Sequence, residues 1–292
     1  MSRVALVGLG EVGRVFAEDL AASGPVVLVA WDVAFADPAG VASRNARELP
    51  VEAAASSTSA VRGADLVISA VTAARCEEAA RDAAEGIDAG AWFFDLNSSS
   101  PGQKQRAAAV IEQAGGRYVE AALMSPIWPR RLGSPFLLGG PSAADFAGAA
   151  GTWGFSDVTV FSATVGQAAA TKLCRSVIVK GLESLLMESL LAARAFGVEQ
   201  EVLDSLSNIL PPADWEAVAT YFVSRSLQHG ERRAEEMAEA AATVRDAGVD
   251  PVMSLAAVRR QEWAATRRDA LVTEQGDVDL GATIDRIRGE LP

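Results

Sequence analysis

The stretch VALVGLGEVGRVF, residues 4–16, decides the fold of the first half of the chain. Its apolar start predicts a strand, its glycines follow the pattern G-x-G-x-x-G, and its later residues have helical spacing. In such a turn the first glycine allows the bend, the second lets the backbone approach a pyrophosphate, and the third lets helix and strand pack closely. We therefore expect the turn to hold the phosphates of a dinucleotide. The predicted contacts are Gly8, Leu9, Gly10, Glu11, Val12 and Gly13.

A second apolar run, residues 26–31, is followed by Asp32, about twenty residues beyond the glycines, where nucleotide-binding folds place an acidic partner for the ribose hydroxyls. A carboxylate there also repels a 2′-phosphate, so we favour NAD as the cofactor. NADP stays open as the alternative, because Arg44 and Arg47 follow and would meet a phosphate if the loop folds back.

Strand and helix patterns then alternate along the chain. The predicted strands cover residues 64–71, 92–96, 117–124 and part of 155–161, and the predicted helices cover residues 73–84 and 102–114. Repeated units of this kind imply a doubly wound, mostly parallel sheet, which is the architecture of a Rossmann domain.

Ligands bind such sheets at the carboxyl ends of the strands. Three segments, residues 69–72, 95–100 and 124–126, fall at these ends, and we expect them, with the loop that follows the third, to line one cleft. Their predicted cofactor contacts are Ala70, Val71, Thr72 and Asn97, and their predicted substrate contacts are Ser98, Ser125 and Arg130. Arg130 and its neighbour Arg131 suit an anionic substrate group, because guanidinium binds carboxylate and phosphate in two-point geometry. A solvated surface pair is the alternative.

The stretch GQAAATKLCRSVIVKGLESLLMESLLAARAFG, residues 166–197, predicts one helix about 45 Å long. Its middle is apolar on nearly every side, so we expect a second subunit to cover part of it, in a homodimer formed through residues 166–196. Helical patterns continue beyond it. We therefore predict a dinucleotide-binding domain over residues 1–163 and an all-α domain, with this helix at its centre, over residues 164–292.

Charge and composition narrow the possible functions. The net charge of −12 and pI near 4.7 argue against a nucleic-acid or anionic-membrane partner and favour a small-molecule substrate. The chain starts directly with a strand pattern, without an apolar leader or membrane span, so we expect it in the cytoplasm. Its single histidine, His229, excludes a metal site of several histidines, and we expect no metal.

Four segments, in this order, resemble the β-hydroxyacid dehydrogenase superfamily, which includes 3-hydroxyisobutyrate and 6-phosphogluconate dehydrogenases. GLGEVG at residues 8–13 resembles the family's cofactor motif, and DLNSSSP at 95–101 resembles its D-x-S-T-x-x-P loop. VEAALMSP at 119–126 resembles its D-A-P-V-S-G-G segment, and GQAAATKLCRS at 166–176 resembles its G-x-x-x-x-x-K-x-x-N-N helix. TKLCRSVIVKGLESL and HGERRAEEM resemble a subgroup labelled phosphogluconate dehydrogenase-like, whose C-terminal domain has no agreed function.

The resemblance implies that Lys172 is the catalytic lysine. The departures from the family pattern fall on substrate-facing positions: Asn97 stands in place of the usual serine, and Ser176 in place of the asparagine four residues after the lysine. The family's later lysine is missing, and Arg233 or its neighbour Arg232 is the candidate substitute. His229, close to these arginines, is a further candidate for substrate contact.

We expect Lys172 to act as the general acid and base of a hydride transfer, because burial near the start of a helix disfavours its charged form. Ser176 follows one turn later and is expected to bond the substrate, while Asn97, Ser98 and Ser125 form the opposite wall. Lys180 is expected to be structural, as a partner of Glu183 or Glu236.

Three functions follow from these patterns. The leading hypothesis is an NAD(P)-dependent dehydrogenase or reductase of a small, polar or anionic β-hydroxy acid or related alcohol. An imine or ketone reductase of the same fold is the second, although such relatives typically replace the lysine that this chain keeps at Lys172. A non-catalytic, dinucleotide-binding regulatory protein is the third, supported only by the replaced serine and asparagine positions.

Overall fold

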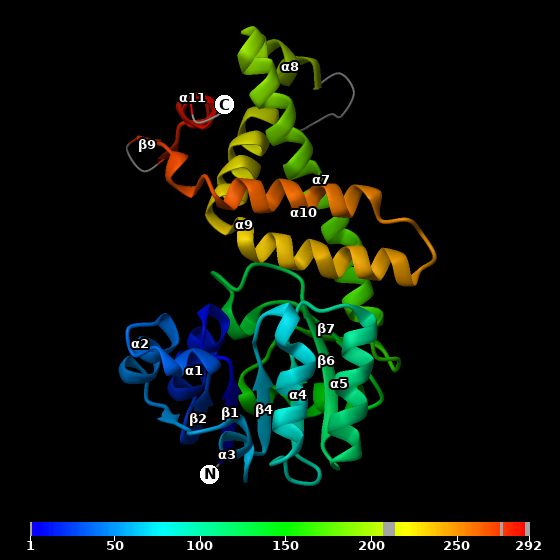
Figure 1. The fold of residues 1–292 in the computed structure, drawn as a ribbon. Helices are drawn as coiled ribbons and strands as arrows, with labels where there is room; N and C mark the ends of the chain where they lie inside the picture. Colours follow the sequence, from blue (N-terminus) through cyan, green and yellow to red (C-terminus); the bar gives the residue numbers. More distant parts are fainter. Residues whose placement is uncertain (1, 207–213, 275–276, 290–292) are drawn as a thin grey trace. The chain divides into compact units, whose positions relative to one another are not determined.

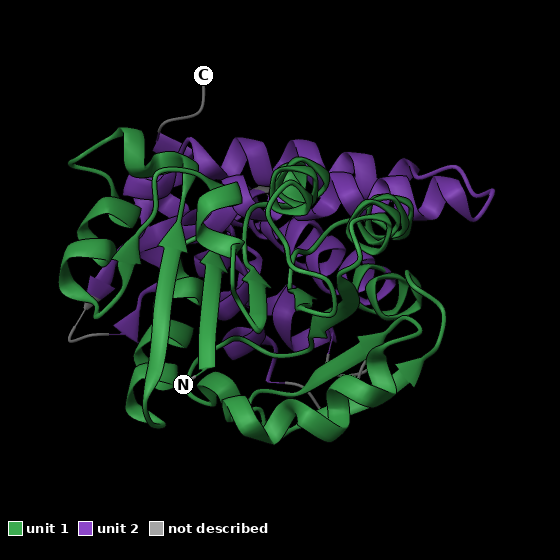
Figure 2. Cartoon of the chain, turned by 90° about the horizontal axis from the view of Figure 1, so that it is seen from below, with its two compact units in different colours: residues 1–173 green, residues 174–292 purple. Residues whose placement is uncertain are grey.

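A computed structural model of the chain describes residues 2–206, 214–274 and 277–289 (Figure 1). The chain divides into two compact units, Met1–Leu173 and Cys174–Pro292 (Figure 2). We expected the division after Ala163, before the long helix, but the units divide within that helix. The first turn of this helix stays with the first unit because its backbone amides donate hydrogen bonds to Glu120, a buried side chain of that unit.

The first unit is built on one eight-stranded sheet with the order β3-β2-β1-β4-β5-β6-β7-β8. Neighbouring strands are parallel except for the pair β6 and β7, so the predicted doubly wound, mostly parallel sheet is confirmed. The strands are β1 Ser2–Val7, β2 Val26–Trp31, β3 Glu52–Ala53, β4 Leu66–Ser69, β5 Trp92–Asp95, β6 Arg117–Leu123, β7 Phe136–Gly139 and β8 Val158–Ser162.

Helices cover both faces of this sheet, which explains why its central strands are continuous apolar runs. Successive side chains of a strand point to opposite faces, so Phe93 joins the apolar cluster that includes α4 and α5, while Phe94 joins the cluster that includes α1 and α6. Each fully buried phenylalanine stabilises the fold by about 1.5–3 kcal/mol. The helices are α1 Glu11–Ala22, α2 Val41–Glu48, α3 Ser57–Val61, α4 Cys76–Ala84, α5 Pro101–Gln113 and α6 Ala143–Ala149.

The second unit is helical, and its core gathers apolar residues of α7, α8, α9, α10 and α11. These helices are α7 Gln167–Phe196, whose first turns belong to the first unit, α8 Glu199–Leu206, α9 Trp215–Asp246, α10 Val252–Ala265 and α11 Leu280–Gly289. The long predicted helix is confirmed in α7. The predicted helical second unit is also confirmed, and it holds in addition a short antiparallel ladder, in which β9 (Thr273–Glu274) pairs with β10 (Asp277–Val278).

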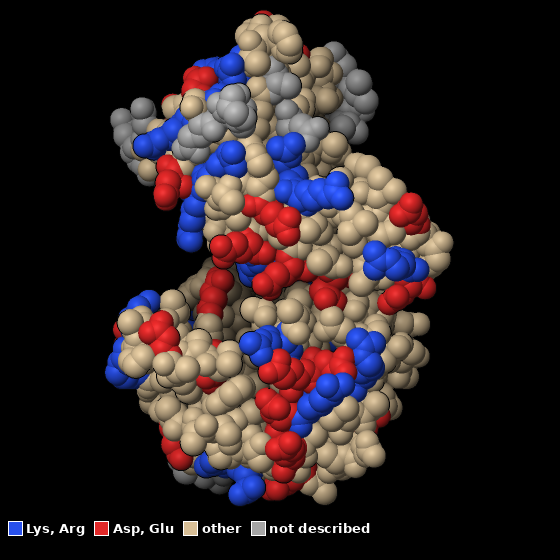
Figure 3. Space-filling view, viewed as in Figure 1, with Lys and Arg blue, Asp and Glu red and all other residues tan. Residues whose placement is uncertain are grey.

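The helix α9 is kinked at His229, where the backbone leaves helical geometry, with φ −128° and ψ 18°. Within the described residues, no helix is both long and apolar enough to span a membrane. On the face drawn in Figure 3, acidic and basic side chains lie interspersed. Over the whole sequence, acidic residues outnumber basic ones.

Candidate functional site

The glycine turn between β1 and α1 has the geometry that a dinucleotide needs. Gly8 has φ +99°, and a Cβ there would lie 2.3 Å from the Ala70 carbonyl oxygen. A Cβ at Gly13 would lie 2.2 Å from the Gly8 carbonyl oxygen, so helix and strand meet too closely for a side chain. At Gly10, by contrast, a Cβ would have no described atom within 4 Å. The helix start at Gly10 therefore faces open space, which fits the approach of a pyrophosphate.

Asp32 lies at the end of β2 and holds the glycine turn in place. Its carboxylate accepts hydrogen bonds from the Leu9 amide and the Ala34 amide, each at 2.8 Å. Each oxygen keeps further acceptor capacity, so these bonds leave room for ribose hydroxyls. Arg44 donates to the Ala39 carbonyl, and both Arg44 and Arg47 are exposed on α2. The residues present thus fit an adenosine ribose next to Asp32.

Asn97 joins the ends of two neighbouring strands. Its Oδ1 accepts a hydrogen bond from the Val71 amide at 2.7 Å, and its Nδ2 donates to Ser69 Oγ at 2.9 Å. The side chain is buried, and it fixes the segment after β4 against the loop after β5. The predicted contacts Ala70, Val71 and Thr72 therefore lie beside Asn97, as expected of one lip of a cleft.

Asp95, the last residue of β5, is the centre of a buried polar cluster that sequence reasoning missed. Lys104 Nζ lies 2.7 Å from Asp95 Oδ1, and the Tyr118 hydroxyl donates to Oδ2 at 2.7 Å. The Asn97 amide donates to Oδ1 at 2.9 Å, which orients the loop that follows. Burial alone would lower the pKa of Lys104, but Asp95, together with Cys76 and Glu120, outweighs burial and raises it. Lys104 therefore stays charged inside the fold.

The same cluster explains why Cys76 is not a reactive thiol. Burial raises the pKa of Cys76 to about 12, and the Asp95 carboxylate adds to the effect. Burial likewise raises the pKa of Tyr118 well above its usual value. Both groups are neutral at physiological pH, and the thiolate needed for nucleophilic chemistry does not form.

Lys172 lies in the second turn of α7 and meets the loop after β5. Its Nζ donates a hydrogen bond to Ser98 Oγ at 2.7 Å. Both residues line a small cavity of about 10 Å³, close to the volume that one water needs. Asn97, Lys104 and Glu120 also line it. Three of the predicted site residues, Lys172, Ser98 and Asn97, are thus brought together within the first unit.

Glu120, on β6, is a second buried charge that sequence reasoning missed. Its carboxylate accepts hydrogen bonds from the Gly166 amide at 2.6 Å and the Ala169 amide at 2.5 Å, both at the start of α7. Burial raises the pKa of Glu120, whereas the Lys104 ammonium and the two amides favour its ionised form. In the sequence, the sign of this buried charge is a glutamate inside the otherwise apolar run VEAALM.

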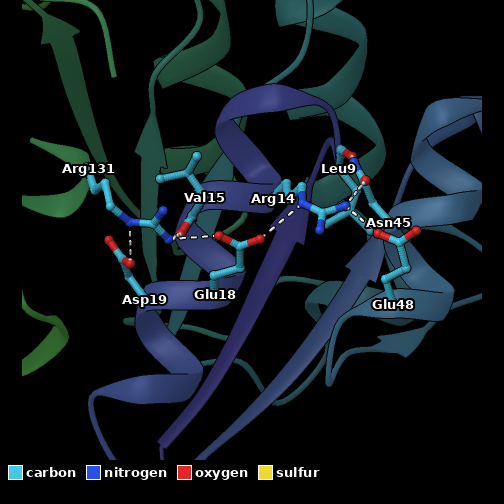
Figure 4. A network of polar contacts seen from close by, with 8 residues as sticks. All are labelled: Leu9, Arg14, Val15, Glu18, Asp19, Asn45, Glu48 and Arg131. Carbon is cyan, nitrogen blue, oxygen red and sulfur yellow. Dashed lines mark hydrogen bonds and ion pairs between the residues drawn. The ribbon is translucent and has the colours of Figure 1, made fainter. Parts of the chain in front are cut away.

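The predicted residues of the long loop, 124–135, have partners of their own. Arg130 pairs with Asp157 at 3.4 Å, on the exposed surface. Ser125 Oγ donates to the neighbouring Pro126 carbonyl at 3.0 Å. Arg131 binds Asp19 at 2.6 Å and Glu18 at 2.8 Å on α1, as Figure 4 shows.

Figure 4 also shows that this contact extends to the glycine turn. Glu18 bonds Arg14 at 3.0 Å, Arg14 bonds Asn45 at 2.8 Å, and Asn45 donates to the Leu9 carbonyl at 2.8 Å. The loop is therefore anchored, through Arg131 and α1, to the backbone of the predicted phosphate site.

The remaining predicted residues lie in the second unit. Ser176 Oγ accepts a hydrogen bond from Lys180 at 3.3 Å, and Lys180 forms an ion pair with Glu236, one of its two predicted partners. Arg233 is buried in an ion pair with Glu183.

His229 lies 2.6 Å from Arg225, between its ring Nε2 and the guanidinium Nη1. Burial lowers the pKa of His229 to about 4, helped by the positive charges of four arginines. The imidazole is therefore neutral at physiological pH. In the described part of the chain, no group of histidine, cysteine and acidic side chains is arranged to hold a metal ion.

Comparison with known proteins places the two halves in recognised groups. Residues 3–145 match the NAD binding domain of 6-phosphogluconate dehydrogenase, and residues 193–264 match a domain of unknown function, DUF1932. No curated protein sequence matches the chain. A conserved hypothetical protein from Sinorhizobium meliloti is 34% identical, with a TM-score of 0.74, over 100% of this chain and 97% of that one.

Two solved structures of known type share the fold at lower identity. The 3-hydroxyisobutyrate dehydrogenase of Mycobacterium tuberculosis is 20% identical, with a TM-score of 0.72, over 99% of both chains. An imine reductase of Streptomyces aurantiacus is 19% identical, with a TM-score of 0.56, over 98% of this chain and 99% of that one. At these identities the likeness concerns the fold, and it extends over both units.

Proposed function

The chain belongs to the 6-phosphogluconate dehydrogenase-like family of NAD-binding proteins, in the group that carries the DUF1932 domain, and from this membership we propose that it is an NAD(P)-dependent oxidoreductase. Its substrate in this proposal is a small polar β-hydroxy acid or a related alcohol. When bound, the nicotinamide accepts a hydride in oxidation and returns it in reduction.

The observation that carries the proposal is the hydrogen bond of 2.7 Å between Lys172 Nζ and Ser98 Oγ. It joins the amine to the loop after β5, whose next polar residue, Asn97, is tied to the segment after β4. In a doubly wound sheet this edge is where ligands bind. An amine held there, beside a turn suited to a dinucleotide, is arranged for acid–base chemistry on a substrate hydroxyl.

In the proposed mechanism Lys172 carries the proton. In oxidation its neutral amine accepts the proton of the substrate hydroxyl, and in reduction its ammonium returns that proton to the alkoxide oxygen. Ser98 orients the amine, and Asn97 holds the cofactor-side wall. The predicted contributions of Ser176, Ser125, Arg130, His229 and Arg233 to substrate binding remain part of the proposal.

The glycine turn, residues 8–13, and Asp32 are proposed to hold the dinucleotide. NAD is the preferred cofactor in this proposal because Asp32 would repel the 2′-phosphate of NADP. Titration calorimetry with each dinucleotide tests the preference, and tighter binding of NADP would reverse it. The cytoplasm stays the predicted location.

The function is tested by a screen of hydroxy acids, phosphorylated or phosphonate analogues and amino alcohols, each with NAD and with NADP. With an active substrate, Lys172→Ala is expected to lower kcat by a factor of about 10²–10⁴, with cofactor affinity nearly unchanged. Lys180→Arg is the matched control, because it keeps the charge that pairs with Glu236, and its kcat should stay close to that of the wild type. Loss of cofactor affinity in Lys172→Ala with turnover retained would refute the assignment.

An imine or ketone reductase is the second candidate, because the imine reductase described above shares the fold over both units. Reduction of cyclic imines with NADPH or NADH, without oxidation of any hydroxy acid, would favour it. Binding of the dinucleotide without turnover of any substrate would instead favour the non-catalytic regulatory protein.

A further inference from the structure

Glu120 is a fully buried charge in the middle of the strand β6. The structure makes room for it. A Cβ at Gly139, on the neighbouring strand β7, would lie 2.4 Å from Glu120 Oε2, so only glycine leaves space for this carboxylate. A buried carboxylate is costly unless it is well paired, which raises the question of what it does.

Its partners belong to the helix that carries Lys172. The carboxylate accepts hydrogen bonds from the Gly166 and Ala169 amides and so caps the first turn of α7. An uncapped helix start carries roughly half a positive charge, which a carboxylate neutralises. Lys172 follows Ala169 by three residues, which corresponds to about 4.5 Å along the helix axis.

Glu120 and Lys172 line the same small cavity, together with the loop residues Asn97 and Ser98 and the buried Lys104. Charges that face so small a space are screened less than charges in bulk water.

The other charged and titratable groups nearby are accounted for. Lys104 of α5 and Asp95 of β5 pair with each other, and both influence the pKa of Glu120, Lys104 lowering it and Asp95 raising it. Cys76 of α4 and Tyr118 of β6 face Asp95 and are neutral, because burial raises the pKa of each. Glu120 is thus the carboxylate that reaches the start of α7.

We infer that Glu120 is a positioning residue for Lys172: its carboxylate fixes the first turn of α7, offsets the positive end of that helix and thereby favours the ammonium form of the lysine. This inference rests on the proposed function for its relevance to catalysis. It differs from the expectation that the helix end lowers the basicity of Lys172, because in this inference Glu120 neutralises that end.

The direct test is the titration of Lys172 by NMR, with lysine labelled with ¹³C and ¹⁵N in the full chain. The sequence has only three lysines, Lys104, Lys172 and Lys180, so the spectrum is simple and Lys172→Arg assigns the signal. Glu120→Gln removes the charge at nearly constant volume. The pKa of Lys172 should then fall by on the order of one unit.

Asp214→Asn is the matched control, because Asp214 also caps a helix, with its carboxylate accepting a hydrogen bond from the Ala217 amide in the second unit. It should leave the pKa of Lys172 unchanged. Glu120→Asp keeps the charge but withdraws it by one methylene, so the pKa should fall by less than in Glu120→Gln. If Glu120→Gln does not fold, the pKa of Lys172 is compared between the wild type and Glu120→Asp.

A pKa of Lys172 that stays the same or rises in the Glu120 variants would overturn the inference, as would an equal fall in Asp214→Asn. With an active substrate, the pH at which kcat/KM for oxidation reaches half of its plateau should move down by the same amount as the pKa in Glu120→Gln. The NMR result does not depend on turnover. A shifted pKa in a protein without activity would refute the proposed function alone, and activity with an unshifted pKa would refute the inference alone.

Discussion

Asp95 shows how one buried residue can hold the loop of a candidate site in place. Its buried side chain binds Lys104, Tyr118 and the Asn97 amide, and these contacts hold the loop that carries Asn97 and Ser98. Buried ion pairs of this kind add little net stability but are costly to break, because one charge is then left without a partner. The geometry of the loop therefore depends on the pair as a unit.

The first prediction follows from this pair. Lys104→Met leaves the Asp95 carboxylate buried without its cation and should lower the free energy of unfolding by about 3–5 kcal/mol. Arg106→Met is the matched control on the same helix, because the ion pair of Arg106 with Glu77 is largely exposed, and it should cost less than about 1 kcal/mol. Urea unfolding followed by circular dichroism measures both. Equal losses in the two variants would contradict the prediction.

The glycine turn allows a second prediction, in which two glycines of one motif respond differently. A methyl group at Gly13 would collide with the Gly8 carbonyl, so Gly13→Ala should destabilise the fold by about 1–3 kcal/mol. A methyl group at Gly10 meets no described atom, so Gly10→Ala should fold normally. It should still weaken dinucleotide binding by about tenfold or more, because the methyl group projects where the pyrophosphate is expected.

Thermal unfolding and titration calorimetry with NAD and NADP separate the two effects. The alanine at position 10 should change affinity without changing stability, whereas the alanine at position 13 should change stability first. Normal dinucleotide affinity in Gly10→Ala would refute the assignment of this turn as the phosphate site.

At the scale of elements, the sheet was predictable where strands are buried on both faces. The strands β1, β2, β4, β5 and β6 are short apolar runs with glycine or polar residues at their ends, so pattern alone indicates them. The strand β7 was missed because its four residues, FLLG, follow an irregular segment rich in proline and arginine. β3 has only two residues, and α2 and α3 are too short for helical spacing to stand out.

The candidate site was predictable to the same limited degree. Lys172 was found because lysine is rare in this chain and lies within a recognisable segment, and Ser98 and Asn97 because they follow a strand. The pairings of Asp95 with Lys104 and of Glu120 with the start of α7 join residues far apart in sequence, so spacing does not show them. Charged residues inside apolar strand runs were the available signal.

The helix α9 allows a third prediction, about pH. His229 lies where this helix loses its regular geometry, and its pKa is lowered to about 4 from the usual 6.5. The unfolded chain therefore takes up a proton near pH 6.5, while the folded chain does so only near pH 4. The contribution of His229 to the free energy of unfolding is therefore fully present above pH 6.5 and is lost progressively as the pH falls toward 4.

Replacement of the imidazole should remove this pH dependence. Because His229 is the single histidine, the difference between the wild type and His229→Gln isolates its contribution from that of the carboxylates. Urea midpoints measured at pH 7.5 and pH 5 should differ more in the wild type than in His229→Gln. Identical pH dependence in both proteins would show that the folded state does not resist protonation of this ring.

At the scale of the whole molecule, α7 leaves apolar side chains uncovered. Ile178, Leu182 and Leu185 follow one another at intervals of four and three residues, so they share one face of the helix. Their exposed fractions are 66%, 37% and 52%, although the same helix contributes Met187 and Leu190 to the core of the second unit. A continuous apolar face of this kind marks an association surface. The predicted homodimer through residues 166–196 is therefore our proposal for what covers it.

The dimer provides the last prediction. Sedimentation velocity at micromolar concentration should give a dimer for the wild type. The variant that combines Ile178→Glu with Leu185→Glu should sediment as a folded monomer, because the carboxylates it introduces repel each other across a symmetric interface. Val252→Glu is the matched control, since Val252 is 60% exposed on α10 and lies outside the proposed interface; it should remain dimeric. Circular dichroism checks that all three proteins are folded. A wild type that sediments as a monomer, or a Val252→Glu variant that dissociates as completely as the double variant, would contradict association through the long helix.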